Sequence, residues 1–324
     1  MEDIAPNSKA LDCMTTFIPA EINELHQAFT PEEHDIKETI IKKKSKKALF
    51  IRYIYEGNDC KYSKEETELG ESFRAFFIQK FKKDHPKLVD EINQAPSSFL
   101  LRFVYGSKSD EHHESAAESL KECFLKKHLL YKKDMTINAT HLDIYNTGAI
   151  YVFGRDIALR PILHIHFIKW YELMKKYDFE SLKDSIFIFL NYVINNLLIP
   201  GKIENWVTIY NFDHIGHSKM KKLKKLIKCL HFNKANYSRI YRAYNFHVGM
   251  TINMSLRSSR SKKGTRHKYK TKIINSKKTD KLWEHISKSQ VQKEFGGFVE
   301  NLHEEFLFFP PKCPSNNYRH SYTE

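Results

Sequence analysis

The sequence predicts an α/β protein with a mixed or largely parallel sheet flanked by helices, preceded by a small N-terminal helical module. After Asn138, short runs rich in β-branched and aromatic residues alternate with longer runs of helical periodicity, an order typical of α/β domains. Residues 66–133 carry helical periodicity alone. A chain of 324 residues with 41% hydrophobic content is long enough and apolar enough to bury a core.

The α/β part is predicted from the length and spacing of its apolar runs. Strands are expected at 150–153, 162–168, 206–212, 241–248 and 272–275, and helices at 179–198, 218–230 and 280–287. In the helix at 218–230, lysines alternate with apolar residues that are expected to face the body of the protein, which predicts an exposed basic face.

The N-terminal half is predicted to be helical with one interruption. Residues 66–133 are expected to form three short packed helices, the first with Phe73, Phe76, Phe77 and Phe81 on one face. Residues 22–39 also have a helical pattern, and 48–55 form either a short strand or a buried helix turn. The lysine run at 42–47 is either a solvated linker, a contact for anionic lipid or an address signal. The expected divisions are 1–65, 66–135, 136–298 and a loose tail at 299–324.

Charge and cysteine content restrict the partners and the compartment. The net charge of +14 favours anionic partners, namely nucleic acid, acidic protein or an anionic membrane, and does not choose among them. Five widely spaced cysteines without a CxxC pair argue against a zinc site and a disulfide framework. With a start that lacks an apolar run, they predict a cytoplasmic protein. The longest apolar stretch, 186–200, is shorter than the roughly 20 residues of a membrane span.

No motif for catalysis or nucleotide binding stands out. The chain lacks GxSxG, HExxH, Walker A and GxGxxG patterns, so neither an enzyme nor a cofactor is expected. His164 and His166 alternate on one strand face, where they either hold a metal or, as we expect, are polar groups in a pocket or on a solvent face. A second set either holds a metal or, as we expect, forms a helix start with acidic residues near the positive end of the helix dipole; it comprises Asp110, Glu111, His112 and His113. The absence of zinc-finger, KH and ribonucleoprotein motifs argues against nucleic acid.

The order of motifs over residues 66–298 resembles the CRAL-TRIO family, which includes phosphatidylinositol transfer proteins and carriers of retinaldehyde and tocopherol. The motifs that carry the resemblance are SFLLRF at 98–103, GRD at 154–156 with RP at 160–161, the segment 204–216, YSRIYRAY at 237–244, and KI at 272–273 with VQKEFGG at 291–297. The resemblance implies non-catalytic binding and transfer of one phospholipid or other hydrophobic ligand in an apolar pocket behind a mobile gate.

The resemblance also assigns roles to individual residues. The gate corresponds to 249–256, and the apolar lining, for which ordinary core packing is the alternative, to Val207, Ile209, Phe246, Val248, Met250, Ile252 and Met254. The headgroup positions are Lys108, Ser238 and Lys272. A basic stretch beside the gate is expected either to dock to anionic membranes or to be a solvated loop; its residues are Arg257, Arg260, Lys262, Lys263, Arg266, Lys268 and Lys270.

Several positions depart from the family pattern. Leu159 and His214 stand where glycines are expected, and Asn211 stands where the central strand has an aspartate. Ser107 and Ser238 replace the arginine and glutamate of phosphatidylinositol binders, which predicts a weaker preference for that lipid. The alternative function is a protein-interaction or membrane-docking scaffold in which the pocket is closed.

Overall fold

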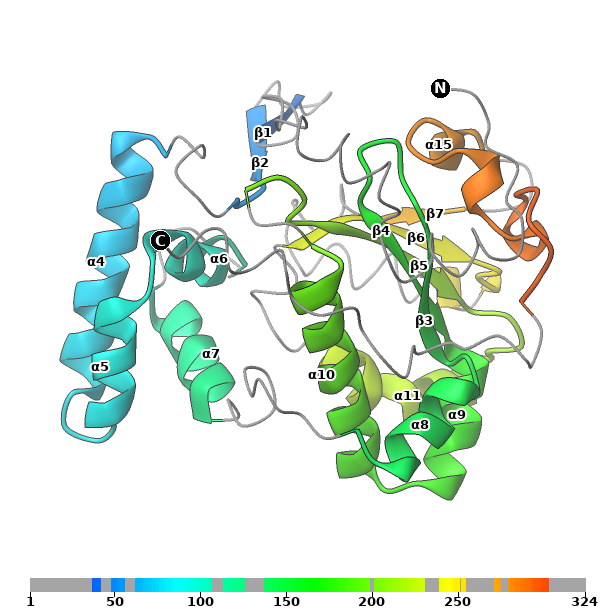
Figure 1. Cartoon of the computed structure of the whole chain (residues 1–324), viewed down its shortest axis with the longest axis horizontal. Coiled ribbons are helices and arrows are strands. Elements are labelled where there is room, and N and C mark those ends of the chain that lie inside the picture. The colour runs from blue at the N-terminus through cyan, green and yellow to red at the C-terminus, as the bar shows by residue number, and fades with distance from the viewer. Residues whose placement is uncertain are drawn as a thin grey trace.

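The computed structural model describes residues 37–41, 48–55, 62–106, 113–125, 137–198, 201–230, 239–250, 252–254, 271–274 and 279–302. A group of helices stands beside a sheet that has further helices packed on it (Figure 1). Among the described residues, no helix is both long and apolar enough to cross a membrane.

The N-terminal part contains a β-hairpin instead of the predicted helix end. Strands β1 (Lys37–Ile41) and β2 (Ala48–Arg52) pair antiparallel. The prediction of helix at 37–39 is therefore wrong, because pairing with β2 stabilises the extended form of the run Thr39, Ile40 and Ile41. The alternative of a strand at 48–55 is confirmed for β2. The lysine run and residues 22–36 lie outside the described residues.

The described part of the helical module contains four helices, not three short ones. They are α4 (Lys64–Phe81), α5 (Pro86–Gln94), α6 (Ser97–Gly106) and α7 (His113–Leu125). The 18-residue helix α4 begins with a capping box between Ser63 and Glu66, and Pro86 starts a separate helix rather than continuing it. The predicted phenylalanine face is confirmed: Phe73, Phe77 and Phe81 are buried in the core that the four helices share, and the partly buried Phe76 packs against it.

The second part is built on a five-stranded mixed sheet with the strand order β3-β4-β5-β6-β7. The strands are β3 (Ile150–Arg155), β4 (Pro161–His166), β5 (Trp206–Asn211), β6 (Ile240–Phe246) and β7 (Thr271–Ile273). Only the β3–β4 pair is antiparallel. All residues of β3 to β6 are buried, as expected of a sheet covered on both faces. The predicted α/β class and its five strands are confirmed.

Helices gather on one face of this sheet (Figure 1). They are α8 (Ala139–Asn146), α9 (Phe167–Lys176), α10 (Phe179–Asn196) and α11 (His217–Leu230). The predictions for α10 and α11 are confirmed, and Leu223 and Leu226 of α11 are buried as expected. The predicted strand at 162–168 was too long, because β4 ends at His166 and α9 begins at once with two more apolar residues. Helices α8 and α9 were not predicted.

Short C-terminal helices and part of the N-terminal segment cover the opposite face. They include α15 (Asp280–Trp283), η1 (Lys288–Gln290) and η2 (Lys293–Phe295), so the predicted helix at 280–287 is shorter than expected. Their buried residues form one core cluster with Tyr53 and Tyr55. The close return of this segment needs Gly297, since a Cβ there would lie 1.8 Å from the carbonyl oxygen of Val291.

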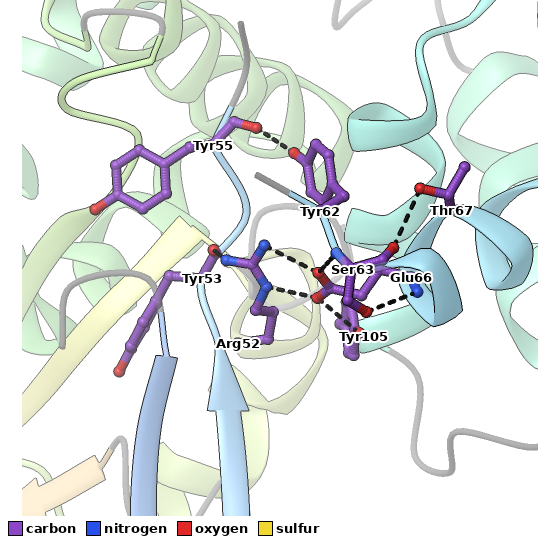
Figure 2. A network of polar contacts seen from close by, with 8 residues as sticks. All are labelled: Arg52, Tyr53, Tyr55, Tyr62, Ser63, Glu66, Thr67 and Tyr105. Atoms are coloured by element: carbon purple, nitrogen blue, oxygen red, sulfur yellow. Dashed lines mark hydrogen bonds and ion pairs between the residues drawn. The ribbon is translucent and has the colours of Figure 1, made fainter. Parts of the chain in front are cut away.

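A polar network connects the end of β2 to the helical module (Figure 2). The guanidinium of Arg52 donates two hydrogen bonds to the Glu66 carboxylate, at 2.6 and 3.2 Å, and Tyr105 of α6 donates to the same carboxylate. On the sheet side, the Tyr53 hydroxyl accepts from Arg242 of β6 at 2.7 Å. Residues 52–55, within the predicted N-terminal extension, therefore contact both the helical module and the sheet.

A buried ion network makes a second connection between the two parts. Glu204 Oε2 lies 3.0 Å from Arg102 Nη2 of α6 and 2.7 Å from Arg239 Nη1, which precedes β6. Glu204 Oε1 accepts from the backbone N–H of Gly201. All three side chains are almost completely buried. The arginine of the SFLLRF motif thus fastens the helical module to the entry of strands β5 and β6.

Candidate functional site

The carboxyl edge of the sheet brings polar side chains together. Strands β4, β5 and β6 are parallel, so their last residues His166, Asn211 and Phe246 lie along one edge. In open α/β sheets this edge is the usual place for ligands. Glu294 of η2 reaches the same edge, where its carboxylate accepts from the Asn211 amide at 3.2 Å.

A continuous chain of hydrogen bonds runs through this edge. The Asn211 amide donates to His166 Nδ1 at 3.3 Å, and Nε2 of the same ring lies 3.1 Å from the Tyr151 hydroxyl. The Tyr151 hydroxyl also contacts the side-chain amide of Gln292, with Oε1 accepting at 3.2 Å and Nε2 donating at 3.0 Å. These contacts assign the proton of neutral His166 to Nε2. The chain fastens the C-terminal segment to strands β3, β4 and β5.

His164 lies deeper on the same sheet face. Its ring stacks on Tyr151 with centroids 4.8 Å apart and planes inclined by 4°, and its Nε2 lies 3.2 Å from the Phe153 carbonyl oxygen. Both histidines are buried, so the predicted alternative of a solvent face is wrong. Within the described part of the chain, no three His, Cys, Asp or Glu residues are grouped as a metal site would require.

Burial controls the ionisation of this cluster. It lowers the pKa of His164 to about 3 and that of His166 to about 3, the latter with help from the charge of Lys169. Burial also lowers the pKa of Lys169 on α9 and raises the pKa of Glu294. The two imidazoles are neutral near pH 7, and they serve as hydrogen-bonding and stacking groups rather than as cationic contacts for a phosphate.

The predicted lining residues divide between the two faces of the sheet. Val207, Ile209 and Phe246 are buried with the cluster that includes Tyr53 and Phe295. The other residues of the set come from the segment after β6: Ile252 is buried and Val248 half-buried against the helix-covered cluster, while Met250 and Met254 are 81% and 68% exposed. Five of the seven residues therefore divide between two clusters, and the two methionines belong to neither.

The polar and basic candidates are mostly beyond the described residues. Lys108, Ser238 and the basic stretch with Arg257, Arg260, Lys262, Lys263, Arg266, Lys268 and Lys270 all fall there. Lys272 is in β7, opposite Tyr244 of β6. The headgroup and docking assignments stay predictions.

The departures from the family pattern coincide with unusual backbone conformations. Leu159 and His214 stand where glycine was expected, and both have positive φ, 61° and 55°. Only glycine adopts this left-handed region without a steric penalty. Asn211, in place of the aspartate, donates to Glu294, which a carboxylate could not do. An uncharged amide therefore suits this position.

Sequence reasoning did not single out Tyr151, Lys169, Gln292 or Glu294. They come from β3, α9 and the C-terminal turns, which are far apart along the chain. The sequence feature that could have located this site is the pair of polar residues near predicted strand ends, His166 and Asn211, because the ends of parallel strands meet at one edge of the sheet.

Comparison with known proteins relates the sheet to a family. Residues 145–297 match the CRAL/TRIO domain. No curated protein matches the sequence. Among solved structures, one titled "Crystal structure of Sfh5" is similar at 9% identity and a TM-score of 0.46, over 70% of this chain and 86% of that chain. The matched residues extend from the end of α8 through all five strands to the glycine pair after η2. Residues 145–297, just under half of the chain, are therefore similar to the CRAL/TRIO domain.

Proposed function

We propose that this protein binds one phospholipid or other hydrophobic ligand in an apolar pocket behind a mobile gate and carries it between membranes. The observation that carries the proposal is the CRAL/TRIO match over residues 145–297. Proteins of this family are in general non-catalytic lipid-binding proteins. A carrier needs an apolar interior, since each buried CH₂ group of a ligand contributes about 0.8 kcal/mol.

The segment after β6 supports a gate. Residue 250 and residues 252–254 are helical, with Ile252 buried and the methionines on either side of it exposed. Large exposed apolar side chains on a folded protein often mark an interaction surface, and methionine adapts to ligands of varied shape. The proposed gate would close over the ligand with Ile252 and meet lipid with Met250 and Met254.

For the ligand headgroup we propose Lys108 and Lys272 as phosphate partners, with Ser238 nearby. Two charged positions of phosphatidylinositol binders are serines here, and each charge-assisted hydrogen bond contributes about 1.5–3 kcal/mol. We therefore expect a glycerophospholipid or another anionic or apolar lipid to bind, with a weak preference for phosphatidylinositol. A transfer assay with labelled lipids tests this: Lys272→Ala should slow phospholipid transfer, and strong selectivity for phosphatidylinositol would contradict the assignment.

We further propose a cytoplasmic location with peripheral membrane contact through the basic stretch that contains Arg257 and Lys270. The net charge of +14 supports attraction to anionic lipid. Co-sedimentation with anionic vesicles should weaken as salt rises, because exposed charges are screened beyond about 8 Å at physiological ionic strength. Equal binding to neutral vesicles would contradict a charge-driven contact.

The decisive experiment is native mass spectrometry of the purified full chain. A bound lipid, released on denaturation and identified by its mass, is the expected result. A ligand-free protein that also fails to take up lipid from vesicles would favour the alternative, a scaffold with a closed pocket that docks to a protein or a membrane.

A further inference from the structure

Tyr171 of α9 lies at the centre of a cluster of ammonium groups. The Nζ atoms of Lys175, Lys219 and Lys222 lie 4.9, 5.5 and 5.8 Å from the centroid of its ring. Lys175 is one turn further along α9, and the other two lysines belong to the first turns of α11, which packs beside α9. One aromatic ring therefore gathers three cations from two helices at the surface.

This cluster has little negative charge to balance it. Lys175 pairs with Glu172, and Lys219 donates to the carbonyl oxygen of His214 at 3.1 Å. Within the described residues, the exposed Lys222 has no carboxylate partner. Helix α11 contains six lysines and no acidic residue. Because like charges repel, an anion placed among the three ammonium groups would relieve their repulsion.

The topology puts this cluster near the exposed methionines. Helix α9 begins directly after β4, α11 begins shortly after β5, and Met250 follows β6. Since these strands are parallel, all three segments leave the sheet at its carboxyl edge. Ile252, between the methionines, is buried in the same cluster as Leu223 of α11. The cations and the segment that carries the exposed methionines thus lie at the same edge of the sheet.

We propose that Tyr171, Lys175, Lys219 and Lys222 bind a lipid phosphate group at the surface of an anionic bilayer. Tyrosine is suited to the membrane interface, and lysines attract anionic headgroups. This site would orient the carboxyl edge, with Met250 and Met254, toward the membrane. The inference rests on the proposed function and deepens it, because it adds a second membrane contact to the basic stretch that contains Arg257 and Lys270.

The test compares vesicle binding of the full chain and its variants. Vesicles of phosphatidylcholine alone and of phosphatidylcholine mixed with phosphatidylserine are used at low salt. Removing two of the three cations, the half-buried Lys219 and the exposed Lys222, with Lys219→Ala and Lys222→Ala should weaken binding to the anionic vesicles roughly 30-fold, which corresponds to about 1 kcal/mol for each lysine. Tyr171→Leu keeps the apolar bulk but not the ring, and should weaken binding by up to about fivefold.

A matched control removes the same charge elsewhere. Lys82 and Lys83 are exposed at the end of α4, in the helical module, and their double alanine variant should retain nearly full binding. An equal loss in both double variants would mean that only net charge matters and would overturn the proposal. Unchanged vesicle binding by the Lys219 and Lys222 variant would also overturn the proposal. If that variant lost binding to single-stranded RNA instead, the lysines would contact nucleic acid rather than lipid. Native mass spectrometry distinguishes failure of this proposal from failure of the carrier function, since the Lys219 and Lys222 variant should still contain its lipid.

Discussion

The two buried histidines should make folding stability depend on pH. His164 and His166 have pKa values lowered by burial to about 3 in the folded protein, against 6.5 for an unperturbed imidazole. Protonating His164 would place a charged N–H at Nδ1, a buried atom with no hydrogen-bond partner among the described residues. The unfolded chain therefore binds protons that the folded chain excludes.

The direction and magnitude of the stability change with pH follow from the difference between the histidine pKa values of the folded and unfolded chain. Each histidine contributes stability that is fully present above the unfolded pKa and is lost as the pH falls from 6.5 toward about 3. When the pH falls from about 7.5 to about 5.5, each histidine should lower the free energy of unfolding by about 1.4 kcal/mol, and the pair by about 3 kcal/mol. Glu294, whose pKa is raised by burial, acts in the opposite direction, so the total slope of the wild type does not isolate the histidines.

The assay is urea unfolding at a series of pH values for the wild type and a His164→Gln, His166→Gln variant. Glutamine can still hydrogen-bond to the Phe153 carbonyl or the Tyr151 hydroxyl but does not titrate. Over this pH range, the free energy of unfolding of the wild type should fall by about 3 kcal/mol more than that of the variant. His217→Gln, which removes an exposed imidazole at the start of α11, controls for the substitution itself. Parallel pH dependences in the wild type and the double variant would refute the reasoning.

Three further predictions concern stability, each measured by denaturant unfolding. Glu204→Gln leaves the buried guanidinium groups of Arg102 and Arg239 without their anion and should lower the free energy of unfolding by about 3–5 kcal/mol. A loss below about 1 kcal/mol would mean that these two ion pairs are not formed in solution. His214→Gly should stabilise the protein by about 0.5 kcal/mol, because relief of the positive φ exceeds the added entropy of the unfolded chain, whereas His214→Ala should not stabilise it. Tyr53→Phe removes the oxygen that accepts from buried Arg242 and should cost about 1–3 kcal/mol, unless water reaches that guanidinium.

The sequence alone determined the class of fold and the approximate positions of the five strands. Strands β3 to β6 are covered on both faces, so each is a short, mainly apolar run that is recognisable without knowledge of its neighbours. The long helices α10 and α11 were found for a similar reason, since their apolar residues repeat at helical spacing. The order of motifs was sufficient to indicate the family that residues 145–297 match.

Only the tertiary structure decided what each element packs against. Residues 37–41 are a strand because β2 pairs with them, and the apolar run through His166 changes from strand to helix at Phe167 without a breaking residue. The exposure of Met250 and the burial of His164 depend on which surface covers them, and Tyr171 meets lysines of a helix some fifty residues away. Periodicity records which face of an element is apolar; it does not record the partner of that face, because the partner lies far along the chain.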